Sequence, residues 1–192
     1  APENLLFWRT AAEMPPRLLA LDAPDVDSDA TVNWQRAKAI RQVADVLVAV
    51  LTQQKYNEAA VKQFFRAAVE SDKPIIVIFN QCDLQADWEY WPQWLETFCE
   101  TTGARPELVY LVPYDRAAAE ERRLPFYAVR GDGVALAEGG LPPSSTLRDD
   151  LASLRFDAIK IRTFRGAMRR VLDPERGLPG YLRLIRREAG EF

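Results

Sequence analysis

The sequence has no histidine, and only two of its 192 residues are cysteines. The absence of histidine excludes Ser-His-Asp and Cys-His catalysis by the chain's own residues, together with most zinc sites. Cys82 and Cys99 lack the spacing of a metal site, and two cysteines do not make a disulfide framework in a chain of this length. This usage fits a reducing compartment, so we expect a cytoplasmic protein.

Long hydrophobic runs are also absent, because no apolar stretch approaches the roughly 18 residues that span a bilayer. No signal peptide opens the sequence. The charge is uneven: residues 1–145 hold 14 Lys and Arg against 21 Asp and Glu, whereas residues 146–192 hold 11 against 7. A body with this excess of acidic residues argues against binding of nucleic acid.

The chain does contain short apolar runs that alternate with helical patterns. Each run is nearly continuous, which is typical of strands that are buried on both faces of a parallel sheet. Their alternation with helices predicts a doubly wound α/β fold. The runs are Leu18–Leu21, Val46–Leu51, Ile75–Phe79 and Leu108–Val112, and the helical stretches are Trp34–Val43, Glu58–Val69 and Trp88–Thr102.

One edge of this sheet is expected to be antiparallel. Asn4–Thr10 resembles a strand and reaches Arg17–Asp22 through the short link Ala11–Pro16. A link of this length suits an antiparallel pair and is too short for a crossover. The expected fold is therefore α/β, with a doubly wound, mostly parallel sheet and one antiparallel edge strand.

Two regions are expected along the chain. Residues 1–145 form the α/β core, which ends in the Gly-, Pro- and Ser-rich stretch Arg130–Ser145, interpreted as a loop. Residues 146–192 form a helical extension. In it, Asp173-Pro174 ends or bends a long helix that begins at Thr146, and a last helix starts near Pro179.

An acidic residue follows the first apolar run. Asp22 stands directly after Leu18–Leu21, at the carboxyl end of the expected strand. In open α/β sheets this edge is where ligands bind, and an aspartate there can help to hold Mg²⁺ near phosphate groups. The alternative is an aspartate that caps the following turn, and for this residue alone we favour that alternative.

Polar residues also follow the third run, where Asn80, Gln81 and Asp83 come after Ile75–Phe79. A carboxylate can accept two parallel hydrogen bonds from a planar pair of N–H groups. Guanine has such a pair on its Watson–Crick edge and adenine does not, so an aspartate here can select guanine. The structural alternative is an Asx turn at the end of a strand.

Together the two motifs resemble those of the GTPase superclass, whose third motif is Asp-x-x-Gly and whose fourth is Asn-Lys-x-Asp. Asp22 and Asn80 are 58 residues apart, with one strand and two helices expected between them. The run Asp-Ala-Pro-Asp-Val-Asp-Ser from Asp22, Ala44-Asp45 ahead of a strand and Tyr56 ahead of a helix are similar to bacterial dynamin-like or Era-like GTPases. The resemblance covers residues 4 to about 115.

The resemblance implies a protein that binds GTP or GDP with Mg²⁺. Asp22 would act on the metal through water, Asp83 would pair with the guanine edge, and Asn80 would brace the base and the phosphate loop. For the fifth motif, Pro113 and Tyr114 are the first choice. The second choice is Val129-Arg130-Gly131.

Three positions depart from the family pattern. Gln81 stands where the family has a lysine whose stem covers the base. Asp25 replaces a glycine whose N–H meets the γ-phosphate, and Val26 occupies the place of the catalytic glutamine of small GTPases. Hydrolysis would therefore need another way to position water.

The phosphate-binding pattern Gly-x-x-x-x-Gly-Lys-[Ser/Thr] occurs nowhere in the sequence. We expect that loop to precede Asn4 in a longer protein, of which this chain is a segment that contributes guanine-nucleotide binding and GTP hydrolysis. The alternative is a pseudo-GTPase, a scaffold that keeps the fold and acts through protein partners. An unrelated doubly wound domain is the third interpretation.

Two clusters have both a structural and a functional interpretation. The aromatic residues at helical spacing are more typical of core packing than of a binding platform; they are Trp88, Trp91, Trp94 and Phe98. A basic cluster on the long helix fits a solvated face better than a contact with anionic lipid; its members are Arg162, Arg165, Arg169 and Arg170. The C-terminal helices nevertheless stay candidates for a peripheral membrane contact or for homo-oligomerisation.

Overall fold

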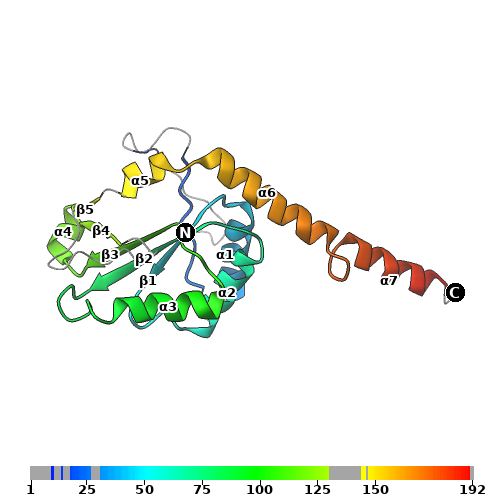
Figure 1. Ribbon diagram of the computed structural model, residues 1–192, viewed down its shortest axis with the longest axis horizontal. Coiled ribbons are helices and arrows are strands. Elements are labelled where there is room, and N and C mark those ends of the chain that lie inside the picture. The colour runs from blue at the N-terminus through cyan, green and yellow to red at the C-terminus, as the bar shows by residue number, and fades with distance from the viewer. Residues whose placement is uncertain are drawn as a thin grey trace.

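The structure is a computed structural model that describes residues 10, 14, 18–26, 31–129, 144–145 and 147–190. A sheet lies between two layers of helices, and a helical arm projects from this α/β body (Figure 1). The helices are α1 (Thr31–Val43), α2 (Ala59–Val69), α3 (Trp91–Thr102), α4 (Arg116–Glu120), α5 (Leu147–Ser153), α6 (Phe156–Leu172) and α7 (Leu178–Gly190). The strands are β1 (Leu47–Leu51), β2 (Ile75–Cys82), β3 (Leu108–Pro113), β4 (Phe126–Ala128) and β5 (Ser144–Ser145).

The sheet has the strand order β1-β2-β3-β4-β5. β1, β2 and β3 are parallel, and α2 and α3 form the crossovers between them. β4 pairs with β3, and β5 with β4, in the antiparallel sense. The prediction of an α/β fold with parallel strands joined by helices is therefore confirmed.

The continuous apolar run of β2 is explained by burial on both faces of the sheet. Val77 and Phe79 lie in a core cluster with Phe65 of α2 and Phe98 of α3. Ile76 and Ile78 point to the opposite face, where leucines of α5 cover them. Each of these side chains contributes about 1.5–3 kcal/mol by leaving water. Helices on both faces are what a doubly wound fold requires.

The predicted antiparallel edge is wrong in position. Leu18–Leu21 is irregular and not a strand, and the Leu19 side chain is 77 % exposed. Among the described residues, no strand pairs with the outer edge of β1, so Leu18–Leu21 does not extend the sheet there. The antiparallel pairing is at the opposite edge, in β4 and β5. The proposed strand Asn4–Thr10 falls, apart from Thr10, outside the described residues.

The C-terminal half also differs in detail from the expectation. Most of the predicted loop Arg130–Ser145 falls outside the described residues, but its last two residues form β5. The single long helix expected from Thr146 is divided at Leu154-Arg155 into α5 and α6. This division lets α5 lie on the sheet, where the Tyr110 hydroxyl donates a hydrogen bond to Asp150 at 2.5 Å. The predicted break at Asp173-Pro174 is confirmed, and α7 follows it.

The aromatic residues of α3 and of the turn before it pack as predicted. Trp91 and Phe98 are buried, and Trp88 and Trp94 pack against the same core cluster. The Trp94 ring lies 5.8 Å from that of Phe79, centroid to centroid. These residues therefore attach α3 to the sheet.

The basic cluster of α6 makes contacts that its sequence did not indicate. Arg162 donates to Glu107 at 2.6 Å, Arg169 donates to Asp72 at 2.7 Å, and Arg170 donates to the Ser71 hydroxyl at 2.7 Å. Three of the four arginines thus bind the body. Among the residues described, no helix is long and apolar enough to cross a membrane.

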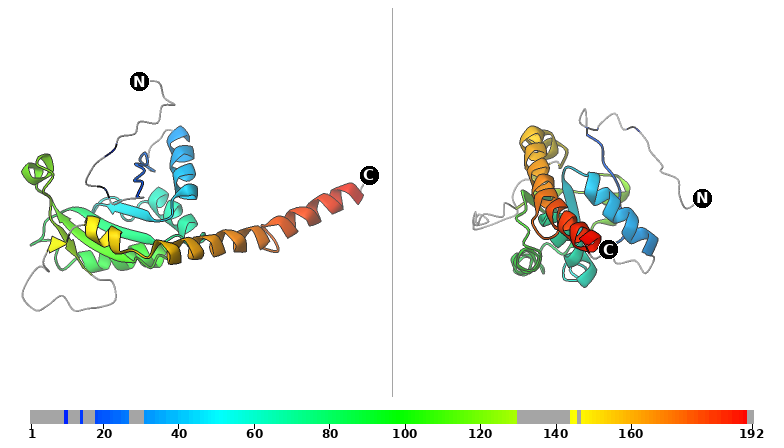
Figure 2. Two further views of the ribbon diagram at one scale, coloured as in Figure 1. Left: turned by 90° about the horizontal axis from the view of Figure 1, so that it is seen from above. Right: turned by 90° about the vertical axis from the view of Figure 1, so that its right-hand side faces the viewer.

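The arm leaves the body beyond α6. α6 lies along the body as far as Arg169 and Arg170, whereas α7 continues away from it in Figure 1 and in the left view of Figure 2. Every residue from Tyr181 to Gly190 is exposed. α7 therefore gains almost nothing from packing against the body.

Candidate functional site

The candidate site lies at the carboxyl ends of the parallel strands. Cys82 of β2 pairs with Pro113 of β3, and the Tyr114 N–H donates to the Cys82 carbonyl at 3.1 Å. These contacts bring Asn80, Gln81 and Asp83 beside Pro113 and Tyr114. The structure therefore places five of the six predicted site residues at one edge of the sheet, where open α/β sheets bind ligands.

A β-bulge shapes this edge. The pairing runs from Phe79 with Leu111 to Cys82 with Pro113, so that Asn80 and Gln81 face Val112 alone. Gln81 has φ of 61°, in the left-handed region, which costs a non-glycine residue about 1–2 kcal/mol. Bulges and strained residues of this kind concentrate next to functional sites, where they redirect side chains. Here the bulge leaves the Gln81 side chain exposed and Asn80 half-buried.

Asp83 follows the bulge with its carboxylate turned back to its own loop. Oδ1 accepts hydrogen bonds from the N–H groups of Gln85 at 3.0 Å and Ala86 at 3.1 Å. These bonds lower the pKa of Asp83, so it is ionised at neutral pH. This is the Asx-turn geometry of the structural alternative. It occupies Oδ1, and within the described part of the chain no hydrogen bond engages Oδ2.

Asp87 organises the site and was missed by the sequence analysis. Its side chain is 9 % exposed, and Oδ2 accepts from the Asp83 N–H at 2.7 Å and from Gln53 Nε2 at 2.5 Å. Gln53 belongs to the loop after β1, so one buried carboxylate joins the loops that follow β1 and β2. Asp87 follows Asp83 by four residues, which is about one helical turn, and this spacing was the signal in the sequence that the two residues could contact each other.

Cys82 lies under this network but is not a reactive thiol. Burial, followed by the negative charge of Asp87, raises the pKa of Cys82 to about 11. Its thiol donates to the Phe79 carbonyl. Burial also raises the pKa of Cys99. Because only the thiolate is a nucleophile or a metal ligand, neither cysteine supplies that chemistry at neutral pH.

Asp22 is apart from this group. It lies in the irregular segment 18–26, exposed, and no hydrogen bond or ion pair among the described residues joins it to the strand-end site. No cluster of three or more His, Cys, Asp or Glu side chains suited to a metal occurs in the described ranges. A single exposed carboxylate fits Mg²⁺ only in the mode in which phosphates and water supply the other ligands.

Asp25 and Val26, which depart from the GTPase pattern, both contact other residues of the body. Asp25 forms an ion pair with Lys55 at 3.8 Å, in the loop after β1. Val26 is half-buried and packs against the core cluster beneath α2 and α3. These contacts attach the segment to the same end of the sheet as the candidate site.

The open edge of β1 adjoins the site. Val48 is 41 % exposed and Val50 is 58 % exposed, and both point to the face of the sheet opposite α2 and α3. Over β2 and β3 that face is covered by α5. The outer edge of β1, which pairs with no strand in the described part of the chain, is suited to pairing with a further strand.

Comparisons with known proteins add no family to this description, since no family model, curated protein or solved structure matches the chain.

Proposed function

We propose that the body is part of a guanine-nucleotide-binding domain of the GTPase superclass, and that it works within a longer protein of bacterial dynamin-like or Era-like type. The observation that carries this proposal is the bulge at Asn80–Gln81. It is a strained segment that presents amide and carboxylate groups at the carboxyl edge of a parallel sheet.

In this proposal Asp83 recognises the base. Its Oδ1 is oriented by two loop N–H groups, and its main chain is held by Asp87. The carboxylate is therefore held in one orientation before guanine binds. Oδ2 accepts from one N–H of the base, and Oδ1 exchanges one of its two loop donors for the second N–H. Adenine presents no such pair, so binding of adenine would leave the carboxylate unpaired.

Asn80, Gln81, Pro113 and Tyr114 surround the base in the same proposal. Asn80 braces the loop from the bulge, and the exposed stem of Gln81 covers one face of the base. Tyr114 is 70 % exposed and lies beside Cys82, so its ring is available to contact a ligand.

In this proposal the phosphates are bound by a loop of the longer protein that is not part of residues 1–192. The open edge of β1 takes the strand that carries the phosphate-binding loop, and the helix after that strand covers Val48 and Val50. Asp22 would hold Mg²⁺, which neutralises the phosphate charge when it is bound. Asp22 and Asp83 then act at opposite ends of one nucleotide.

The pseudo-GTPase alternative rests on the segment after Asp22. Asp25 is paired with Lys55, and Val26 is packed into the core. These are the two positions that a small GTPase uses to sense the γ-phosphate and to position water. A domain built in this way keeps nucleotide binding or a scaffold role without hydrolysis.

The test uses the protein extended upstream of residue 1 by its own coding sequence. Calorimetric titration should show GDP bound at least a hundredfold more tightly than ADP. D83N should reverse the preference from guanine toward xanthine nucleotides, whereas D115N, at the N-cap of α4, should not. Equal affinity for GDP and ADP would refute the assignment of Asp83. Steady-state phosphate release then separates the GTPase from the pseudo-GTPase.

Residues 1–192 alone should bind GTP negligibly. Hydrogen bonds to the base contribute about 0.5–3 kcal/mol each, against an association cost of about 4–15 kcal/mol. Micromolar binding of GTP to this chain would show that the phosphate contacts come from residues 1–192 themselves.

A further inference from the structure

The arm carries an apolar stripe along both of its helices. Ten large apolar side chains of α6 and α7 are between 39 % and 65 % exposed. The central ones are spaced alternately by three and four residues within each helix, which is the seam of a helix that pairs with another helix. They are Ile161, Phe164, Met168 and Val171 in α6, and Leu178, Leu182 and Ile185 in α7.

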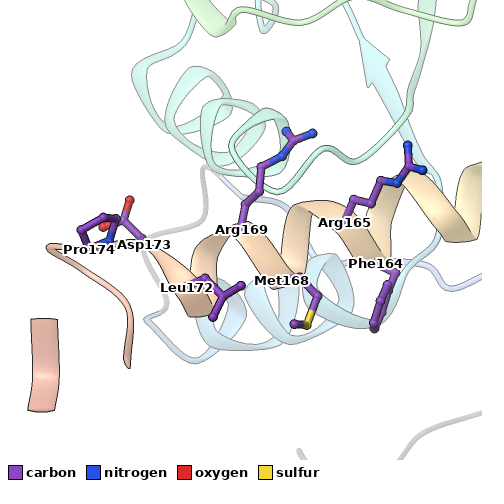
Figure 3. Close-up of a pocket in the computed structure, with 7 residues that line it drawn as sticks. All are labelled: Phe164, Arg165, Met168, Arg169, Leu172, Asp173 and Pro174. Atoms are coloured by element: carbon purple, nitrogen blue, oxygen red, sulfur yellow. The ribbon is translucent and has the colours of Figure 1, made fainter. Parts of the chain in front are cut away.

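The stripe of α6 points away from the body. The opposite side of the helix is the docked side, where Ile159 is buried and a Cβ added to Gly166 would lie 2.6 Å from the Ser71 carbonyl oxygen. Figure 3 shows Phe164 and Met168 on one side of α6 and Arg169 on the other. Contact with the body therefore fixes the direction of the stripe.

A hollow lies at the junction of the two helices. It has a volume of about 450 Å³ and is lined by Phe164, Met168, Leu172 and Pro174, together with Arg165, Arg169 and Asp173 (Figure 3). This shallow hollow has room for a side chain of a partner helix.

α7 would gain stability from such a partner. It has 13 residues, and isolated helices shorter than about 12–15 residues are marginal in water. Its described residues from Tyr181 onward are all exposed, so the body supplies no compensating burial.

The charges beside the stripe select the kind of partner. Arg165 follows Ile161 by four residues, and Arg186 follows Leu182 by four, so both border the stripe on the same side. Lys160 borders it on the other side, four residues before Phe164. Arg165 makes no hydrogen bond or ion pair within the described residues, so it is available to a partner.

The arm disfavours an antiparallel second copy and a bilayer. Two identical stripes packed antiparallel would place Arg165 and Arg186 against the same arginines of the other copy. An anionic bilayer would suit Arg183 and Arg187 of α7, but it would meet Glu188 on the border of the stripe, and it has no side chain to enter the hollow. Arg162, Arg169 and Arg170 already bind the body, so they are not free to contact lipid headgroups.

We propose that the stripe of α6 and α7 docks an amphipathic α-helix of another protein that carries acidic residues beside its own apolar face. The apolar seam supplies the affinity, and the pairing of Arg165, Arg186 and Lys160 with carboxylates selects the partner. This inference does not depend on nucleotide binding.

The test titrates residues 1–192 with two synthetic helical peptides of 28 residues. Both have Leu and Ile in the seam, and they differ only in having Glu or Lys at every flanking position. Fluorescence anisotropy should show the Glu peptide bound at least tenfold more tightly than the Lys peptide. The double variant M168E/L182E should lose at least tenfold of that affinity.

Two further variants separate docking from a general loss of structure. L19E places the same charge on an exposed leucine outside the arm and should bind as the wild type does, and circular dichroism should show the same helix content in all variants. R165E/R186E should bind the Lys peptide more tightly than the Glu peptide.

Three results would overturn the proposal. Equal binding of the two peptides, or binding of neither, would show that the basic residues beside the stripe do not select an acidic partner helix. A dimer in sedimentation velocity that M168E/L182E dissolves identifies the second copy as the occupant. Binding to vesicles of phosphatidylserine and phosphatidylcholine that M168E/L182E abolishes, with no binding of the Glu peptide, identifies the bilayer.

Discussion

β2 in the body and α6 in the arm are both rich in apolar side chains, but they use them differently. Five consecutive residues of β2, Ile75–Phe79, are buried. In α6, Phe164 is 65 % exposed, and only Ile159 is buried among the large apolar side chains described. The apolar side chains of the body therefore stabilise its fold, whereas those of the arm stay exposed and available to a partner. The same substitution should therefore cost much more stability in the body than in the arm.

The largest expected difference is between two phenylalanines. F79A should lower the free energy of unfolding by about 3–5 kcal/mol, because it opens a cavity in the core. F164A should change it by no more than about 0.5 kcal/mol, because the ring is already in water. Urea denaturation followed by tryptophan fluorescence measures both. Similar losses for the two variants would show that the arm packs against the body in solution.

The next comparison is between two aspartates at the strand-end site. D87A should cost about 1–3 kcal/mol, because it leaves the Asp83 N–H and Gln53 without their buried acceptor. D115A removes an exposed cap that accepts from the Ala118 N–H and should cost about 0.5–1 kcal/mol. Amide exchange at Asp83 should rise in D87A alone. Unchanged exchange would mean that Asp87 does not hold the loop.

Two glycines test the docking of α6. In G166A the new methyl group would lie 2.6 Å from the Ser71 carbonyl oxygen, so α6 must shift, and a loss of about 1 kcal/mol or more is expected. In G190A the new methyl group meets nothing within 4 Å, so the stability should be unchanged or slightly higher. Hydrogen exchange of the turn at Ser71–Asp72 reports the docking. Protection that survives in G166A would contradict the close approach.

The last comparison is between neutral and alkaline pH. The pKa of Cys82 is raised in the folded protein to about 11 from an ordinary value of 9.0. The folded state therefore keeps its proton where the unfolded chain loses it. The stability due to this thiol is complete below pH 9 and falls as the pH rises toward 11. C82A should lack this component, and the difference between the two unfolding curves at pH 8 and pH 10.5 measures it.

The sequence determined the parallel part of the fold because its signals are local. Continuous apolar runs at Val46–Leu51, Ile75–Phe79 and Leu108–Val112 became β1, β2 and β3, within one to three residues of the predicted bounds. The same logic placed Asn80, Asp83 and Tyr114 at one edge, since the carboxyl ends of parallel strands meet there. It failed at Leu18–Leu21, because a strand also needs a neighbour, and the run itself does not specify one.

Tertiary structure alone decided the remaining features, because each of them depends on residues far apart in the chain. The bulge at Asn80–Gln81 appears only when β2 is set against β3. The role of Asp87 depends on Gln53, 34 residues away, and the contacts of Arg162 and Arg169 depend on Glu107 and Asp72. The sequence shows that the arm is amphipathic, and its docking on the body determines which side of α6 faces outward.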